Sequence, residues 1–155
     1  MIQMKRILLP TDFSDCARAA LNYACAFVEQ FGSELHLLHV VQDVMLMMPE
    51  PGSAFALPQN YLLDLKTGAE KSLAGLLDET WLVDKKVVRA TRLGSAFVEI
   101  VRYAREHEID LVIVGTHGRS GLKHVFLGSV AERVVRKAPC PVLTVRPAGH
   151  QFIMP

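Results

Sequence analysis

The sequence has no apolar run that approaches the roughly 20 residues of a membrane-spanning helix. It also has no excess of one charge, since 17 basic residues face 16 acidic ones and the formal net charge is +1. Such a balance gives no electrostatic reason to expect nucleic acid or a membrane surface as a partner. The first residues, MIQMKRILLPTDFSD, lack a small-residue cleavage site and indicate a first strand instead of a signal peptide. We therefore expect a cytoplasmic protein.

Cysteine is scarce, and its spacing fits neither a disulfide framework nor a metal site. Cys16, Cys25 and Cys140 are an odd number and contain no CxxC pair. His36 and His39 lie on opposite faces of a predicted strand, so they cannot share a ligand. The sequence indicates reduced thiols, no metal-ligating residues and no catalytic nucleophile.

The two best-known phosphate-binding motifs are also missing. No run matches the Walker pattern GxxxxGK[ST], and GxGxxG does not follow the first strand, where the chain reads PTDFSD. This excludes a standard P-loop and a standard dinucleotide site.

What is present is a regular alternation of strand-like and helix-like periods over 155 residues, half of them hydrophobic. Ser14 and Gly32 mark the start and end of the first helix. The pattern predicts a single domain over residues 1–155 with a doubly wound, Rossmann-like α/β fold: a five-stranded parallel sheet of order 3-2-1-4-5 with helices on both faces. The expected strands are Arg6–Pro10, Glu34–Val41, 86–92, Asp110–Val114 and Pro141–Val145, and the four expected helices span about 15–31, 62–76, 96–104 and from Ser129 onward.

A glycine-rich stretch follows the fourth strand, where ligands bind in such sheets. Gly115, Gly118 and Gly128 let backbone amides approach a ligand closely, and Arg119 and Lys123 add positive charge between them. Together they predict a cradle for a phosphate chain.

Ser129 allows two interpretations. As the start of the last helix it can present a hydroxyl and unpaired amides to an anion. With Glu132 it also has the SxxE spacing of a capping box, which would give the serine a purely structural role.

Asp12 likewise has two interpretations. It follows the first strand, where a carboxylate can accept hydrogen bonds from ribose or bind magnesium. It can equally be a turn residue ahead of the Ser14 cap.

The motifs taken together resemble the universal stress protein family. Gly115, Gly118, a gap of nine residues and then Gly128–Ser129 resemble that family's ATP-binding motif. PTDFSD, LLHVV, DLVIVGTHGRSGL and APCPVLTVRP resemble its other landmarks, in the same order and over nearly the whole chain.

The resemblance implies that the chain binds ATP, with Mg²⁺, as a nucleotide-responsive regulator or protective factor in a stress response. It further implies that Asp12 lies near the ribose, that Pro10 lines the adenine, that Val40 contacts the base, and that a homodimer forms through Val142 to Val145. The residues that it assigns to the nucleotide are Pro10, Thr11, Asp12, Val40, Gly115, Thr116, His117, Gly118, Arg119, Ser120, Gly121, Gly128, Ser129, Val130 and Ala131.

Two alternative functions stay open. The chain could be a dimeric partner-binding module that ignores nucleotide and uses the Met- and Pro-rich segment from Val44 to Pro58 for recognition. It could also hydrolyse ATP, although no residue is a candidate for positioning water, so we expect any turnover to be slow.

Overall fold

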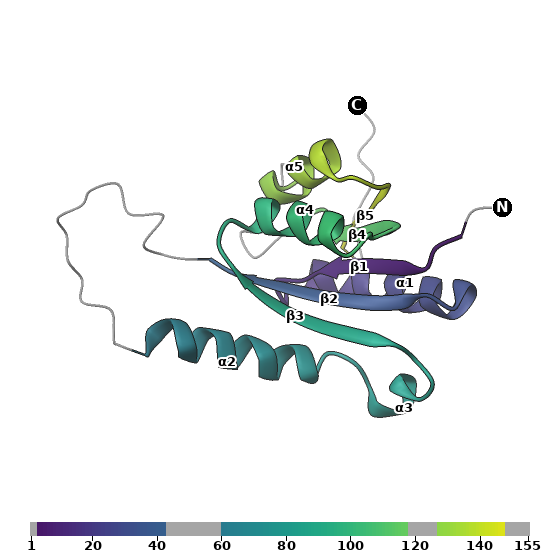
Figure 1. The fold of residues 1–155 in the computed structure, drawn as a ribbon, viewed down its shortest axis with the longest axis horizontal. Coiled ribbons are helices and arrows are strands. Elements are labelled where there is room, and N and C mark those ends of the chain that lie inside the picture. The colour runs from purple at the N-terminus through teal and green to yellow at the C-terminus, as the bar shows by residue number, and fades with distance from the viewer. Residues whose placement is uncertain (1–2, 43–59, 118–126, 148–155) are drawn as a thin grey trace.

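The computed structural model describes residues 3–42, 60–117 and 127–147. They form a five-stranded parallel sheet in the order β3-β2-β1-β4-β5 with helices on both faces, which confirms the predicted fold class (Figure 1). The elements are β1 (Arg6–Pro10), α1 (Asp15–Phe31), β2 (Glu34–Val41), α2 (Tyr61–Ala74), α3 (Glu79–Leu82), β3 (Val87–Leu93), α4 (Ala96–Glu106), β4 (Leu111–Gly115), α5 (Ser129–Lys137) and β5 (Val142–Val145).

Each face of the sheet has its own apolar core. Ile7, Leu9 and Leu35 point toward α1 and α2, whereas Leu8 and Leu38 point toward α4 and α5. Because successive side chains of a strand alternate between faces, inner strands covered on both sides must be apolar throughout. This explains why β1 and β4 read as continuous apolar runs.

The first helix has the predicted boundaries. Ser14 caps it, since its hydroxyl accepts a hydrogen bond of 3.2 Å from the amide of Ala17. Gly32 ends it in the left-handed conformation, with φ of 63°, which glycine adopts at little cost.

Several details differ from the sequence-based expectation. The second predicted helix, α2, ends at Ala74, β3 spans Val87–Leu93 instead of 86–92, and β5 begins at Val142 instead of Pro141. The short helix α3 was not predicted, and it forms because the Asp78 carboxylate caps it at the amide of Thr80. The fourth strand spans Leu111–Gly115 instead of Asp110–Val114. The Asp110 carboxylate accepts hydrogen bonds of 2.7 and 2.9 Å from the amides of Lys5 and Arg6, and its own amide donates to the carbonyl of Arg6 at 2.9 Å.

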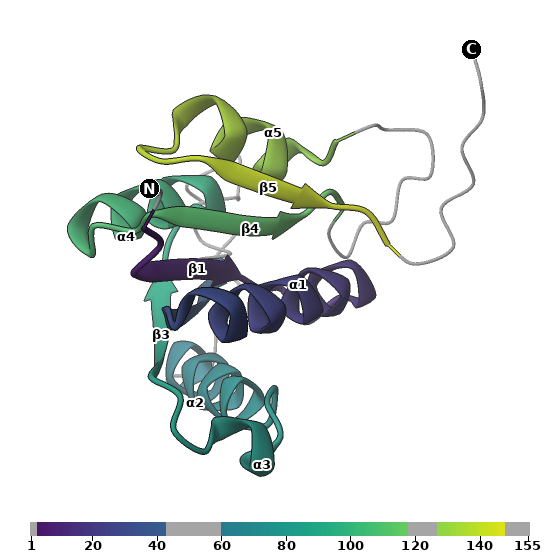
Figure 2. The ribbon, with the colours of Figure 1, turned by 90° about the vertical axis from the view of Figure 1, so that its right-hand side faces the viewer.

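The outer strands are β3 and β5, as predicted for both. Figure 2 shows β5 at the border of the sheet beside β4, with α5 packed on one side. No helix in the described part of the chain is long and apolar enough to cross a membrane.

Candidate nucleotide-binding site

The strand order changes direction between β1 and β4, which lie side by side with Ile7 opposite Leu111. The chain leaves β1 toward α1 on one face and leaves β4 toward α5 on the other. Divergent connections at such a point create the place where ligands bind in open α/β sheets. The candidate site is therefore the shared carboxyl edge of β1 and β4.

The turn after β1 is held by its own polar side chains. The hydroxyl of Thr11 accepts from the amide of Phe13 at 3.0 Å, and Oδ1 of Asp12 accepts from the amide of Ser14 at 3.0 Å. The backbone amide of Thr11 donates to the carbonyl of Leu38 at 2.8 Å. Asp12 thus has the turn role that the sequence allowed, and this interaction fixes where its carboxylate sits.

A histidine from β2 supports the same turn. Nδ1 of His39 donates to the carbonyl of Thr11 at 2.8 Å, and its ring contacts the ring of Phe13 at a centroid distance of 4.7 Å. Phe13 has a positive φ of 65°, an uncommon conformation for a bulky residue. These contacts give His39 a structural role at the edge of the candidate site.

Gly115, the last residue of β4, lies directly against the start of α1. A Cβ atom at this position would come within 2.9 Å of the Cys16 sulfur and within 3.0 and 3.1 Å of the carbonyl carbon and oxygen of Cys16. The contact with sulfur is shorter than real Cβ atoms make, and the contacts with the backbone of Cys16 are tight, so any larger residue at this position would have to displace the start of α1 or the Cys16 side chain. This packing is a second reason for glycine at position 115, beside the predicted role in the phosphate loop.

Thr116 connects three parts of the chain that are far apart in sequence. Its amide donates to the carbonyl of Val145 in β5 at 2.8 Å, and its carbonyl accepts from the amide of Gly128 at 2.6 Å. Its hydroxyl lies 2.9 Å from Nδ1 of His117. The two ends of the glycine-rich segment are therefore joined at Thr116, while Gly118, Arg119, Ser120 and Gly121 lie outside the described residues.

The start of α5 corrects the capping-box interpretation. Gly128 is the N-cap and Ser129 is the first helical residue, so Glu132 falls one position too late to reach back to the cap. Glu132 instead pairs with Arg136 at 2.9 Å. Ser129 is exposed at the helix start, where the first amides have no partners within the helix.

Three apolar residues assigned to the nucleotide, Val40, Val130 and Ala131, belong to the same hydrophobic cluster. Val40 and Val130 are partly buried against the core beneath α4 and α5, together with Phe97 and Leu127. Pro10 and Ala131 are buried. The structure thus brings the described members of the predicted set to one edge of the sheet, although they come from four separate stretches of sequence.

Metal ligands are not clustered at this edge. In the residues that the structure describes, no group of three or more His, Cys, Asp or Glu side chains could hold a metal ion. Of the residues assigned to the nucleotide, the carboxylate of Asp12 is the one with the chemistry for Mg²⁺, which binds through one or two carboxylates and phosphate oxygens.

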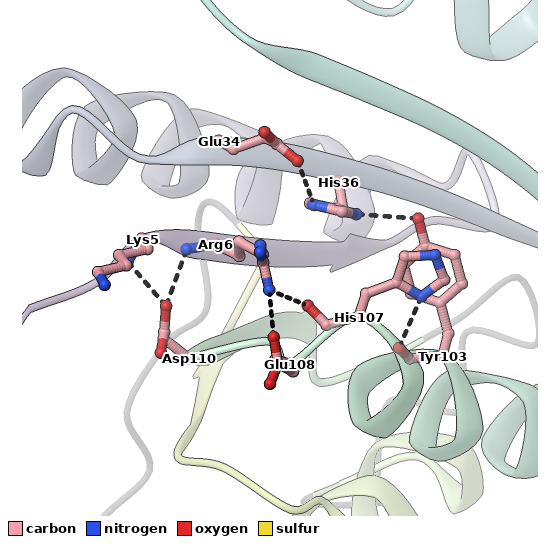
Figure 3. A network of polar contacts seen from close by, with 8 residues as sticks. All are labelled: Lys5, Arg6, Glu34, His36, Tyr103, His107, Glu108 and Asp110. Carbon is pink, nitrogen blue, oxygen red and sulfur yellow. Dashed lines mark hydrogen bonds and ion pairs between the residues drawn. The ribbon is translucent and has the colours of Figure 1, made fainter.

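The opposite edge of the sheet holds a polar network that sequence reasoning missed (Figure 3). His36 is 3% exposed, and its Nε2 donates to Glu34 while its Nδ1 accepts from the hydroxyl of Tyr103, both at 2.9 Å. The ring of Tyr103 stacks on that of His107 at 3.8 Å. Burial lowers the pKa of His36 and outweighs the opposing charge of Glu34. The alternation of apolar residues around position 36 gave no sign of these partners.

A shallow depression of about 570 Å³ also lies at that opposite edge, against Lys5, Phe31 and Lys86. None of the residues assigned to the nucleotide lines it. The chemistry and the topology point to the carboxyl edge, so this depression is not the candidate site.

The chain is similar to known proteins over nearly its whole length. The model of the universal stress protein family matches residues 4–146. Universal stress protein MJ0531 of Methanocaldococcus jannaschii is 35% identical over 143 residues, which cover 92% of this chain and 82% of that protein. Universal stress protein MJ0577 of the same organism is 31% identical over 156 residues, which cover 94% of this chain and 96% of that protein.

Solved structures give the same result. The structure of MJ0577 superposes with a TM-score of 0.82 at 32% identity and covers 96% of this chain and 100% of that one. Universal stress protein UspA from Lactobacillus plantarum superposes with a TM-score of 0.77 at 28% identity, and the superposition covers 94% of this chain and 100% of that one. This chain belongs to the universal stress protein family.

Proposed function

We propose that this protein binds ATP with Mg²⁺ at the carboxyl edge of β1 and β4 and acts as a nucleotide-responsive regulator or protective factor in a stress response. One observation carries the proposal: the hydrogen bond of 2.6 Å from Gly128 to Thr116 places the start of α5 at the end of β4, next to the turn after β1. A helix start at the switch point of a parallel sheet is a site for phosphate groups.

The phosphates would meet the first turn of α5. Gly128 has φ of −63°, which any residue adopts, so the turn itself does not require glycine. The missing side chain leaves the amides of the helix start accessible to an anion, and the hydroxyl of Ser129 adds a donor. Gly118 and Arg119, which lie outside the described residues, would contact the same phosphates, as the family resemblance implies.

The ribose and the metal ion would meet Asp12. Its carboxylate accepts a hydrogen bond from the amide of Ser14, which fixes its position after β1. A carboxylate is the group that accepts from ribose hydroxyls and binds Mg²⁺. The adenine would lie against Pro10, Val40 and Val130, since an apolar surface suits the faces of a base.

Proteins with the same fold support an adenine ligand. A universal stress protein in complex with cAMP superposes with a TM-score of 0.63 at 19% identity. The universal stress protein from Archaeoglobus fulgidus in complex with dAMP superposes with a TM-score of 0.58, also at 19% identity. At this identity the likeness concerns the fold, so it supports the proposal only by showing that the fold accommodates an adenine nucleotide.

The proposal is tested by titration calorimetry with ATP and Mg²⁺. Ser129→Ala should weaken binding about tenfold, since it removes a hydroxyl that donates to a charged group. Ser72→Ala is the matched control, because that hydroxyl bonds the carbonyl of Gly68 on α2 and lies far from the site. Gly118→Ala combined with Ser129→Ala should abolish binding while circular dichroism shows an intact fold. Unchanged affinity in the double variant would refute the site.

A homodimer through β5 is the second part of the proposal. The carbonyls of Pro141 and Val145 bond inward to β4, so the backbone groups of Val142 and Thr144 point away from the sheet. Such an edge can pair with the same edge of a second copy. Thr144→Pro removes one outward amide and should give monomers by analytical ultracentrifugation, while Thr144→Val should stay dimeric. A dimeric Thr144→Pro variant would exclude this edge.

Partner binding without nucleotide is the second candidate function, and one observation favours it. Leu62 and Leu63, in the first turn of α2, are 40% and 62% exposed. They follow the segment from Val44 to Pro58, which lies outside the described residues. A pull-down whose captured protein depends on these leucines and is indifferent to added ATP would support this function over the first.

A further inference from the structure

Arg133 of α5 and Phe97 of α4 form a pair beside the proposed nucleotide site. The guanidinium carbon of Arg133 lies 5.0 Å from the centre of the Phe97 ring, a cation–π contact. We propose that Arg133 is a further phosphate-binding residue of this site and that Phe97 positions its guanidinium. The inference rests on the function proposed above and adds two residues that the family resemblance did not assign.

The ring of Phe97 belongs to the carboxyl edge of the sheet. Phe97 lies in the first turn of α4, directly after β3. The amide of Gly94 donates to the carbonyl of Val41 at 3.0 Å, which joins the start of α4 to the end of β2. Because all five strands are parallel, these ends share one edge with the ends of β1 and β4. Phe97 also packs against the same hydrophobic cluster as Val40 and Val130.

The side chain of Arg133 extends toward the start of its own helix. Arg133 stands four residues after Ser129, and residues at this spacing lie on one face of a helix, one turn apart. Helical side chains lean toward the N-terminus, and the contact with Phe97 in the first turn of α4 agrees with that direction. Figure 1 shows α4 and α5 side by side on one face of the sheet. The guanidinium is therefore held beside the first turn of α5, where the phosphates are proposed to bind.

The charge of Arg133 is not paired with a carboxylate in the described part of the chain. The neighbouring acid Glu132 pairs with Arg136 at 2.9 Å, and Glu99 of α4 pairs with Arg102. Arg133 is exposed, and its contact is with an aromatic ring. A ring attracts a guanidinium without taking up its N–H donors as a carboxylate does. These donors can therefore bond phosphate oxygens, for which the planar guanidinium is well suited.

The role of Phe97 follows from the entropy of the arginine side chain. A free arginine loses much rotamer freedom when it binds a ligand, and this loss weakens the interaction. A guanidinium that already lies on a ring has lost part of that freedom before the phosphate arrives. Phe97 should thus strengthen binding through Arg133 without contacting the phosphates itself.

The proposal is tested by calorimetric titration with ATP and Mg²⁺, and with adenosine as a ligand that has no phosphate. Arg133→Gln should weaken ATP binding about tenfold and leave adenosine within about twofold, because the lost contact is with phosphate. Arg133→Lys should lie between the two, since it keeps the charge and loses the planar fork. Arg136→Gln is the matched control: it removes the same charge from the same helix, where Arg136 pairs with Glu132, and should leave ATP affinity within about twofold. Unchanged ATP affinity in Arg133→Gln, an equal loss for adenosine, or an equal loss in Arg136→Gln overturns the proposal.

The positioning role of Phe97 is measured on the same scale. Phe97→Leu keeps most of the apolar volume and should weaken ATP binding about two- to fivefold, whereas Phe97→Tyr keeps the ring and should stay within about twofold of wild type. In the Arg133→Gln background, Phe97→Leu should have no further effect, since it acts through the guanidinium. A loss that persists in this background would mean a packing role and would refute the positioning.

Two further results separate the possible failures. Urea unfolding of each variant distinguishes weaker binding from a loss of folded protein. A wild type that does not bind ATP refutes the proposed function together with this inference. A wild type that binds ATP as tightly as Arg133→Gln refutes this inference alone.

Discussion

Gly115→Ala tests the packing at the centre of the candidate site. The added Cβ would lie 2.9 Å from the sulfur of Cys16 and 3.0 and 3.1 Å from its carbonyl carbon and oxygen. A side-chain sulfur can rotate away, but the two backbone atoms belong to the first turn of α1, so the whole helix start must shift. Overpacking of a core costs about 1–3 kcal/mol, and the involvement of backbone places this substitution at about 2–3 kcal/mol.

The measurement is urea unfolding, with thermal unfolding as a second probe. A loss of about 2–3 kcal/mol corresponds to a decrease in Tm of about 5–10 °C for a domain of this size. Gly68→Ala is the matched control, because Gly68 lies inside α2 with no atom within 4 Å of the added Cβ. That substitution should stabilise the protein by about 0.5–1 kcal/mol, since alanine loses less backbone entropy than glycine in a helix.

The double variant Cys16→Ala with Gly115→Ala separates the two kinds of contact. It relieves the contact with sulfur but not the contacts with the backbone of residue 16, so the destabilisation should be smaller than the sum of the single variants and should not vanish. If Gly115→Ala is as stable as the wild type, helix packing is not the reason for glycine at this position.

The remaining predictions concern buried polar groups. Burial lowers the pKa of His36 in the folded protein, and the charges of Arg6 and His107 add to the effect. The neutral ring therefore contributes its full stability above the pKa of histidine in the unfolded chain, about 6.5, and this contribution is lost as the pH falls below that value. His36→Gln should flatten the dependence of the unfolding free energy on pH in this range. Tyr103→Phe leaves Nδ1 of His36 without its donor and should cost about 1–2 kcal/mol by urea unfolding, and an unchanged midpoint would contradict the hydrogen bond. Burial, with the charge of Glu29, raises the pKa of the Cys25 thiol to about 11. Cys25 should therefore react with a disulfide reagent at neutral pH far more slowly in the folded protein than in an unfolded control. Equal rates would show that the thiol is not held in this environment.

The alternation of strands and helices could be read from the sequence because its signals are local. The period of the apolar residues, the proline at the end of the first strand, the cap at Ser14 and the stop at Gly32 each act within a few residues, and the structure confirms the elements that they predicted. The family also followed from local motifs and their order along the chain.

Other features were decided by contacts between distant parts of the chain. The packing of Gly115 against Cys16 could not be predicted from the sequence, because the two residues lie far apart along the chain. Ser129 was given a place in a capping box because the helix could equally have started one residue later; in the structure Gly128 bonds to Thr116 and takes the cap position itself. His36 gave no sign of its partners, since Tyr103 lies 67 residues further along the chain.

The sequence by itself therefore determined the five strands and four of the helices, their order along the chain and the fold class, because backbone propensity and hydrophobic period depend on neighbouring residues. Only the tertiary structure decided that residues 16, 116, 128 and 145 meet at one point. Their meeting depends on the strand order, which sets β1, β4 and β5 side by side and brings the connections at their carboxyl ends into contact. No pattern within a single segment contains that information.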